Sequence, residues 1–265
     1  MSENFLFRSL VQPLINMVVV IGQMGFFFLK FLHSLIGLPY VFEELILHTY
    51  RICFRCLLPV LGVVTPMGMI ISMQGLAILS IFSAQPLLSS LLVISMLREL
   101  TPAMTAIMIA AQAGSSIAAE LGAMRNREEI DAQEVMSVNP IQFLVVPRLL
   151  AVIIAAPVLT AIANFFGIAG GWVIGVPIKG INHGVFMANL LDFVNIEDIF
   201  SGILKATIFG AIIGVVSCFR GYYARGGAAG VGRAANKAVV ESIIALFVVN
   251  YFLSSAIYSV TEKIN

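Results

Sequence analysis

The sequence predicts an all-α integral membrane protein with five transmembrane helices, preceded by amphipathic interfacial helices and carrying a cytoplasmic helix between spans two and three. Hydrophobic residues make up 60% of the chain and charged residues only 11%, a balance that water-soluble domains do not show. Several uncharged runs reach the length of about 20 residues that an α-helix needs to cross a hydrocarbon core of about 30 Å. The net charge of +1 predicts no nucleic-acid partner, because such a partner requires a concentrated basic face.

Residues 1–56 are expected to form an amino-terminal region of interfacial or elbow helices. The first apolar run, Ser9–Leu29, is uncharged and long enough to cross a bilayer. Proline, asparagine, glutamine and two glycines interrupt this run, so we expect it to lie in the cytoplasmic leaflet without crossing.

The next segment has the charge pattern of an amphipathic helix. Four polar residues fall on one helix stripe, at spacings i, i+4, i+7 and i+11: Glu44, His48, Arg51 and Arg55. A helix of this kind lies on the membrane surface, although the cytosolic end of an ordinary span would show the same stripe. We favour the interfacial helix.

Residues 57–265 are expected to form a five-helix membrane domain. Leu57–Leu97 carries no charge over about twice the length of one span, and turn residues at Ser83–Ser90 divide it into two helices. Three further apolar runs give the remaining spans: Leu149–Ile178, Ile203–Phe219 and Ser242–Thr261. Between these runs we expect a polar loop, Lys179–Asp198, and a glycine-rich loop, Arg220–Lys237.

The distribution of basic residues predicts the orientation of the chain. Most of the 15 Lys and Arg residues fall in segments that this order of hairpins puts on one side of the membrane. That side is therefore expected to be cytoplasmic, and the carboxyl terminus is expected outside.

Two adjacent charges, Arg98 and Glu99, interrupt apolar sequence near the middle of the second predicted span. Each costs about 2.5–3.5 kcal/mol at a helix centre, so pairing, water or a polar cavity must compensate. Neighbours in sequence point in different directions on a helix, so one can tie helices together while the other lines a cavity. A purely structural ion pair with another helix is the alternative.

The segment Glu120–Glu134 (ELGAMRNREEIDAQE) is rich in charge and in helix-forming residues, and Asn139-Pro140 is expected to end it. Four of its residues would share one helix stripe: Glu120, Met124, Arg127 and Asp131. The segment is either a solvated linker helix or a helix that docks into a partner's groove.

Metal, redox and nucleotide sites are not predicted. Cys53-x-x-Cys56 lies on a predicted helix without a second pair, which makes a zinc or redox site improbable. The run Gly226–Gly232 (GGAAGVG) matches neither a Walker A sequence nor a dinucleotide fingerprint, so a flexible loop or tight helix packing is expected there. The chain is therefore expected to be no enzyme and to hold no cofactor, with any ATP bound and hydrolysed by another chain.

Several motifs, in order along the chain, resemble the MlaE/YrbE permease family. They are Met73-Gln74-Gly75, LRELTP at Leu97–Pro102, AGSSIAAELGAM at Ala113–Met124, REEIDAQEVM at Arg127–Met136, NPIQFLVVPR at Asn139–Arg148, Gly221, Gly230-Val231-Gly232 and Ala238–Ser242. The resemblance covers most of the chain beyond about residue 40 and is specific because so many spaced motifs match. Gln112 stands where many relatives have Arg, and Asn250-Tyr251 stands where they have Asp-Phe.

The resemblance implies the membrane subunit of an ABC-type lipid transporter in the bacterial inner membrane. It implies a homodimer with two ATPase subunits, a periplasmic hexamer of MCE domains and room for a small cytoplasmic accessory subunit. The expected substrate is phospholipid, moved between the inner membrane and the MCE conduit so that outer-envelope lipid asymmetry is maintained. The alternatives are an MCE-type importer of fatty acid or sterol, and an ion-coupled secondary transporter centred on Arg98 and Glu99.

The resemblance also implies two groups of functional residues. The coupling helix, at about 120–140, would contact the ATPase through Glu120, Gly122, Met124, Arg125, Arg127, Glu128 and Asp131. A lipid pocket between the two subunits would be lined by Ile71, Ile78, Leu79, Phe82, Arg98 and Glu99. The spacing of the apolar members puts them on or beside one helix stripe, which core packing would also produce.

Overall fold

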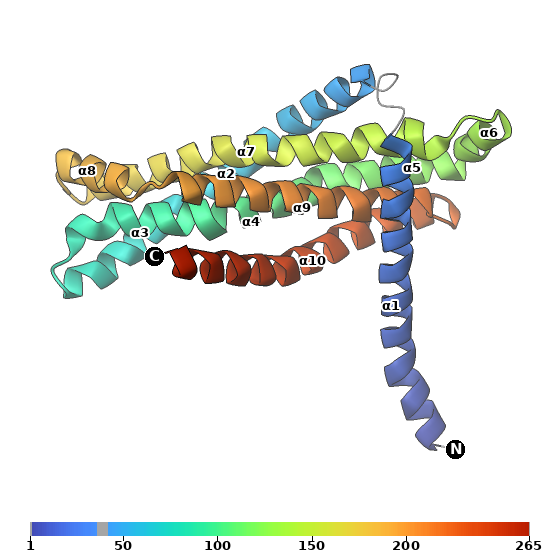
Figure 1. Ribbon diagram of the computed structural model, residues 1–265, viewed down its shortest axis with the longest axis horizontal. Coiled ribbons are helices and arrows are strands. Elements are labelled where there is room, and N and C mark those ends of the chain that lie inside the picture. The colour runs from blue at the N-terminus through green and yellow to red at the C-terminus, as the bar shows by residue number, and fades with distance from the viewer. Residues whose placement is uncertain (1, 36–41, 265) are drawn as a thin grey trace.

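The computed structural model describes residues 2–35 and 42–264, and within these ranges every regular element is a helix. Five helices are long and apolar enough to cross a membrane: Phe42–Ile81, Gln85–Asn126, Ile141–Ile178, Ile196–Tyr222 and Gly227–Ile257. They run along the long axis of the molecule in Figure 1. The predicted all-α membrane fold with five spans is confirmed.

The amino-terminal helix α1 (Ser2–Ser34) runs across the direction of the spans in Figure 1. Its apolar part, Val18–Ser34, is shorter than the helices that qualify as spans. The location of this helix in the cytoplasmic leaflet stays a prediction, and its direction is the one that an interfacial helix takes.

The first span, α2 (Phe42–Ile81), begins inside the segment expected as a separate interfacial helix. Helix α2 continues through residue 56 without interruption, so the stripe of Glu44, His48, Arg51 and Arg55 lies on the same helix as the first span. The buried residues Leu45, Ile52, Cys56, Val60 and Val64 follow one helix stripe across that point, so the same packed face continues along the helix. The division of the chain at this residue is therefore not visible as a break in secondary structure.

The second span is a chain of short helical pieces separated by π-helical turns. The pieces are α3 (Leu88–Ser95), η3 (Met96–Leu100), α4 (Thr101–Ile109), η4 (Ala110–Gly114) and α5 (Ser115–Asn126). The turn before it, which the sequence predicts at Ser83–Ser90, contains the short 3₁₀ helix η2 (Gln85–Leu87). Since π-turns often occur at functional sites, the one that carries Arg98 and Glu99 is of interest.

The third span consists of η5 (Ile141–Val145), α7 (Val146–Val173) and η6 (Ile174–Ile178), and it packs closely on α2. Glycines permit this approach: a Cβ atom on Gly68 would lie 2.0 Å from the carbonyl oxygen of Gly167. Small residues let helix backbones approach closely inside membranes, and that close packing holds the spans together.

Two predicted loops are largely helical in the structure. The polar loop Lys179–Asp198 contains α8 (His183–Phe193), whose first turn is capped by the Asn182 side chain. The glycine-rich loop Arg220–Lys237 shrinks to a short turn between α9 (Ile196–Tyr222) and α10 (Gly227–Ile264). Of the two alternatives for its glycines, a flexible loop or tight helix packing, Gly230 shows the second: a Cβ there would meet the carbonyl oxygen of Arg225 at 2.0 Å. Packing thus overrides the low helix propensity of glycine here.

Candidate functional site

The two charges of the second span are each paired with a charge on α9. Arg98 Nε lies 2.5 Å from Asp198 Oδ1, and Lys205 Nζ lies 2.7 Å from Glu99 Oε1. The side chains of Asp198 and Lys205 are almost fully buried, at 3% and 2% exposure. Arg98 and Glu99 therefore each have an oppositely charged partner, and both partners come from the fourth span.

Helix α10 completes the surroundings of Glu99. Ser254 Oγ lies 3.0 Å from each carboxylate oxygen of Glu99, and Asn250 Nδ2 lies 3.4 Å from Oε2. Lys205 Nζ also donates a hydrogen bond of 2.8 Å to Ser254 Oγ. Spans two, four and five thus meet at the Glu99 carboxylate. We call this group of residues the Glu99 cluster: Arg98, Glu99, Asp198, Lys205, Asn250 and Ser254.

Proline chemistry explains part of this geometry. Pro102 has no N–H group to donate to the carbonyl oxygen of Arg98, four residues earlier. That carbonyl oxygen accepts a hydrogen bond of 2.9 Å from Lys205 Nζ. The lysine therefore satisfies both a carboxylate and a backbone oxygen that the helix itself leaves without its usual α-helical partner.

A glycine brings α9 close enough for these contacts. Asp198, Gly202 and Lys205 stand at i, i+4 and i+7 and so share one face of α9. A Cβ on Gly202 would lie 2.5 Å from the carbonyl oxygen of Leu97, in the turn that carries the two charges. Asp198 and Lys205 were missed by sequence reasoning, which placed them in a loop and at a span end, although their shared helix face was visible in the spacing.

The cluster holds two formal positive and two formal negative charges, so it is neutral as a group. Arg98 and Glu99 keep 24% and 31% of their side-chain surface accessible, unlike their buried partners. The arrangement therefore buries one member of each pair and leaves the other at a partly open polar surface. Such a surface can contact water or the polar part of an amphiphile.

The expected apolar wall of the lipid pocket divides into two pairs. Ile78 and Phe82 are exposed, whereas Ile71 and Leu79 are half-buried and pack against the core. The exposed pair is free to contact lipid or another subunit. That these residues line one pocket with Arg98 and Glu99 stays a prediction.

The expected coupling helix is not one continuous helix. Helix α5 ends at Asn126, Glu128 adopts a left-handed conformation with φ 60°, and the short α6 (Glu129–Val135) follows. The predicted single stripe of Glu120, Met124, Arg127 and Asp131 is therefore wrong. Glu120 and Met124 lie on α5, Arg127 lies in the turn and Asp131 lies on α6, because the chain turns at Glu128.

Local contacts fix the angle between α5 and α6. Arg125 Nη1 lies 2.7 Å from Asp131 Oδ1 across the turn, and Ile130 is fully buried. The Tyr222 hydroxyl donates a hydrogen bond of 3.1 Å to Glu134 Oε1, which attaches α6 to the end of α9. The end of α5, the turn that joins it to α6, and α6 itself are thus held in one conformation by contacts within the chain. We call this part of the molecule the tip.

The expected coupling residues differ in their surroundings. Arg127 and Glu128 are exposed, and Met124 is half-buried against the core. Gly122 is buried, and a Cβ there would lie 3.2 Å from the Ala224 Cβ, so its role is close packing. Glu120 accepts a hydrogen bond from Ser116 and faces Arg148 at 3.8 Å. The exposed apolar side chains of Val135 and Met136, which suit docking to a partner, extend the accessible surface of the tip.

Comparison with known proteins gives a consistent result. The family described as Permease MlaE matches residues 45–256. A "Probable ABC transporter permease protein" of Rickettsia bellii is 35% identical over 254 residues, covering 96% of this chain and 98% of its own. The "Intermembrane phospholipid transport system permease protein MlaE" of Haemophilus influenzae is 30% identical over 262 residues, covering 97% and 99%. "Protein TRIGALACTOSYLDIACYLGLYCEROL 1, chloroplastic" of Arabidopsis thaliana is 36% identical over 168 residues, covering 63% of this chain and 48% of its own.

Proposed function

Because the chain belongs to the MlaE permease family, we propose that it is the membrane subunit of an ATP-driven transporter that moves phospholipid. It is a multi-pass membrane permease of the ABC-transporter class, with five helices able to span a bilayer. The name of the Haemophilus influenzae relative, an intermembrane phospholipid transport permease, supports phospholipid as the substrate. The observation that carries the proposal is the Glu99 cluster, a neutral but partly open polar site inside an apolar helix bundle.

The complete transporter in this proposal lies in the bacterial inner membrane. Two copies of the chain form a homodimer, a partner ATPase binds and hydrolyses ATP, and a periplasmic MCE hexamer receives or delivers the lipid. A small cytoplasmic accessory subunit fits the same arrangement. The role of the complete transporter would be to maintain the lipid asymmetry of the outer envelope. Ile78 and Phe82 are exposed on the first span, where a second copy of the chain or a lipid acyl chain would cover them.

In this mechanism the two parts of the site contact the two parts of an amphiphile. Ile78 and Phe82 contact acyl chains, while the accessible edges of Arg98 and Glu99 contact the headgroup or its water. Asp198 and Lys205 position those edges from behind and compensate their charges. The pairing favours this role over an ion-coupled transporter, since each charge already has a partner within the chain.

Photocrosslinking tests the lipid assignment. A crosslinking amino acid at Ile78 or Phe82 should capture phospholipid, and Glu99→Ala should lower transport more than it lowers the yield of complex. A crosslinker at the exposed Phe165 of α7 measures background capture of surrounding membrane lipid. Mass spectrometry of the adduct distinguishes phospholipid from fatty acid and sterol. Adducts only to neighbouring helices would return Ile78 and Phe82 to a packing role.

A triple charge reversal tests the coupling to ATP hydrolysis. Arg125→Glu, Glu128→Lys and Asp131→Lys together invert the charges of the tip while keeping opposite charges at positions 125 and 131, which form the ion pair. We expect loss of ATPase binding with an unchanged yield of folded permease.

The matched control makes the same three types of change at the other end of the bundle. Lys179→Glu, Asp192→Lys and Glu197→Lys alter exposed residues that flank α8 or lie on it. This variant should retain the ATPase subunit during purification. Full ATP-driven transport by the tip variant would contradict the coupling assignment, and ATPase activity of the permease alone would contradict the need for a partner.

A further inference from the structure

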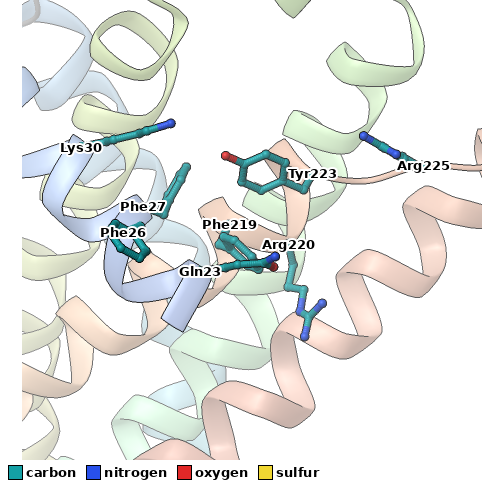
Figure 2. Close-up of a pocket in the computed structure, with 8 residues that line it drawn as sticks. All are labelled: Gln23, Phe26, Phe27, Lys30, Phe219, Arg220, Tyr223 and Arg225. Atoms are coloured by element: carbon teal, nitrogen blue, oxygen red, sulfur yellow. The ribbon is translucent and has the colours of Figure 1, made fainter. Parts of the chain in front are cut away.

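A hollow of about 490 Å³ lies between α1 and the carboxyl end of α9, and none of its lining residues belongs to the Glu99 cluster. Figure 2 shows the side chains that line it, four from α1 and four from the end of α9 and the turn after it. They are Gln23, Phe26, Phe27, Lys30, Phe219, Arg220, Tyr223 and Arg225. The proposed transport mechanism uses none of these residues.

Aromatic contacts hold α1 in place and form the apolar wall of the hollow. The four α1 residues stand at i, i+3, i+4 and i+7, which puts them on one helix face. Phe27 is 2% exposed, and its ring centroid lies 5.8 Å from that of Phe219 and 6.1 Å from that of Tyr223. Phe26 is 72% exposed and stands at the open side. The wall therefore has a packed base and an apolar side chain left to contact something else.

The charge of the lining is entirely positive. Arg220 is neutralised, because its Nε and Nη2 atoms lie 2.6 and 2.5 Å from the two carboxylate oxygens of Glu241. In Figure 2 its guanidinium points away from Lys30 and Arg225, which lie on either side of Tyr223. Neither Lys30 nor Arg225 has an acidic side chain within ion-pair distance among the described residues. Two exposed cations are thus left beside an aromatic wall.

The position of the hollow suits a membrane surface. It lies at the end of the bundle where basic residues are concentrated, which the positive-inside rule identifies as cytoplasmic. Helix α1 runs across the spans at this end (Figure 1), as a helix lying in the plane of the membrane does. Inner leaflets carry anionic lipids, whose phosphates attract Lys and Arg by about 1 kcal/mol per residue near the surface.

We propose that this hollow binds an anionic phospholipid of the cytoplasmic leaflet, which ties α1 to the end of α9. Lys30 contacts the headgroup phosphate as a point charge, while Arg225, on the other side of Tyr223, attracts the anionic headgroup through the field of its guanidinium. Phe26 and the ring of Tyr223 contact the start of the acyl chains. A free phosphate ion shares the headgroup chemistry, but the aromatic wall offers it no partner, so the structure favours the lipid.

Native mass spectrometry of the purified full-length permease tests this site without any transport assay. Phosphatidylglycerol should bind more tightly than phosphatidylcholine. The double substitution Lys30→Ala with Arg225→Ala should lower the affinity for phosphatidylglycerol by about 30-fold, which corresponds to two increments of about 1 kcal/mol. The control pair, Arg233→Ala with Lys237→Ala, removes the same charge from exposed residues at the same end of the bundle. It should weaken the binding clearly less than the first pair does, because neither Arg233 nor Lys237 lines the hollow.

A crosslinker at Phe26 gives an independent readout that keeps both cations. It should yield a phosphatidylglycerol adduct in bilayers that contain this lipid, and the adduct should disappear with the Lys30 and Arg225 substitutions but persist in the control pair. Equal loss in both pairs, equal binding of phosphatidylcholine, or an adduct only with protein would overturn the proposal. Displacement of the lipid by millimolar inorganic phosphate would assign the site to a free anion instead. Failure of these tests would leave the proposed transport function untouched, because they involve other residues.

Discussion

Charged residues occur in two very different settings in this protein, the Glu99 cluster inside the bundle and the α5–α6 tip at its end. In the cluster, Asp198 and Lys205 are almost fully buried and each lies within 2.7 Å of an opposite charge. At the tip, Arg125 and Asp131 also form an ion pair of 2.7 Å, but neither member is buried, since 27% and 49% of their side-chain surfaces stay accessible. The Lys205–Glu99 and Arg125–Asp131 distances are the same, but the two pairs differ in how far water can reach them.

The difference determines what each group of charges can do. A charge in the interior has no water to solvate it, so the chain itself must supply its partner, and losing that partner is costly. An exposed pair contributes little to stability, because water competes for both members. The buried charges are therefore committed to contacts within the chain, while the exposed ones remain available to a second protein.

The sharpest test of this contrast is the removal of Lys205. Lys205→Met should remove the cation beside Glu99 and a hydrogen bond to the carbonyl oxygen of Arg98. The cost should be about 3 kcal/mol, the lower end for a buried pair, because Glu99 stays partly accessible. The free energy of unfolding in lipid bicelles measures the effect. Lys237→Met, an exposed lysine on α10, is the matched control and should change the free energy by less than about 0.5 kcal/mol. Similar losses in the two variants would remove the distinction between the settings.

The close approach of α9 to the second span gives the next largest effect. In Gly202→Ala the new Cβ would lie 2.5 Å from the Leu97 carbonyl oxygen, so the helices must separate at a cost of about 1–3 kcal/mol. Gly232→Ala is the control within a helix, because nothing lies within 4 Å of that Cβ position. It should be neutral or stabilising by up to about 1 kcal/mol. The same unfolding measurement applies, and a tolerated Gly202→Ala would show that the contact is not tight.

The spans and the two charges of the second span could be predicted because both signals are local. A long uncharged run identifies a span, and Arg98 and Glu99 stand out within such a run. Their partners could not be found in this way, since Asp198 and Lys205 lie about 100 residues further along the chain. Only the packing of α9 on the second span joins the two pairs.

The tip shows a different limit of sequence reasoning. Helix-forming residues at Glu120–Glu134 predict one helix, yet the chain turns at Glu128, a residue with no special tendency toward positive φ. The turn lets Ile130 bury itself and lets Arg125 reach Asp131. Tertiary contacts thus decide the shape of the element, as they also do for the glycines at the start of α10.

The ion pair of the tip should be weak despite its short distance. A double-mutant cycle with Arg125→Ala and Asp131→Ala should give a coupling energy of about 0.5–1 kcal/mol that falls as salt is added. Unfolding measurements at low and high ionic strength supply the numbers. The equivalent cycle with Arg98→Ala and Asp198→Ala should give a larger energy that salt barely changes. A salt-insensitive coupling at the tip would mean that this pair, too, is shielded from water.

The smallest change in stability is expected at Glu128, where the turn itself can be separated from the charge. A left-handed conformation costs an L-residue about 1–2 kcal/mol, and glycine avoids this cost. Glycine also lowers the free energy of unfolding by about 0.5–1 kcal/mol, because its unfolded state has more conformational freedom. Glu128→Gly should therefore raise the free energy of unfolding by about 0–1.5 kcal/mol, whereas the β-branched Glu128→Val should lower it. If Glu128→Gly also binds the ATPase subunit less tightly at unchanged stability, the carboxylate acts on the partner. A clear loss of stability would instead show that Glu128 is held by its own chain, like the charges of the Glu99 cluster.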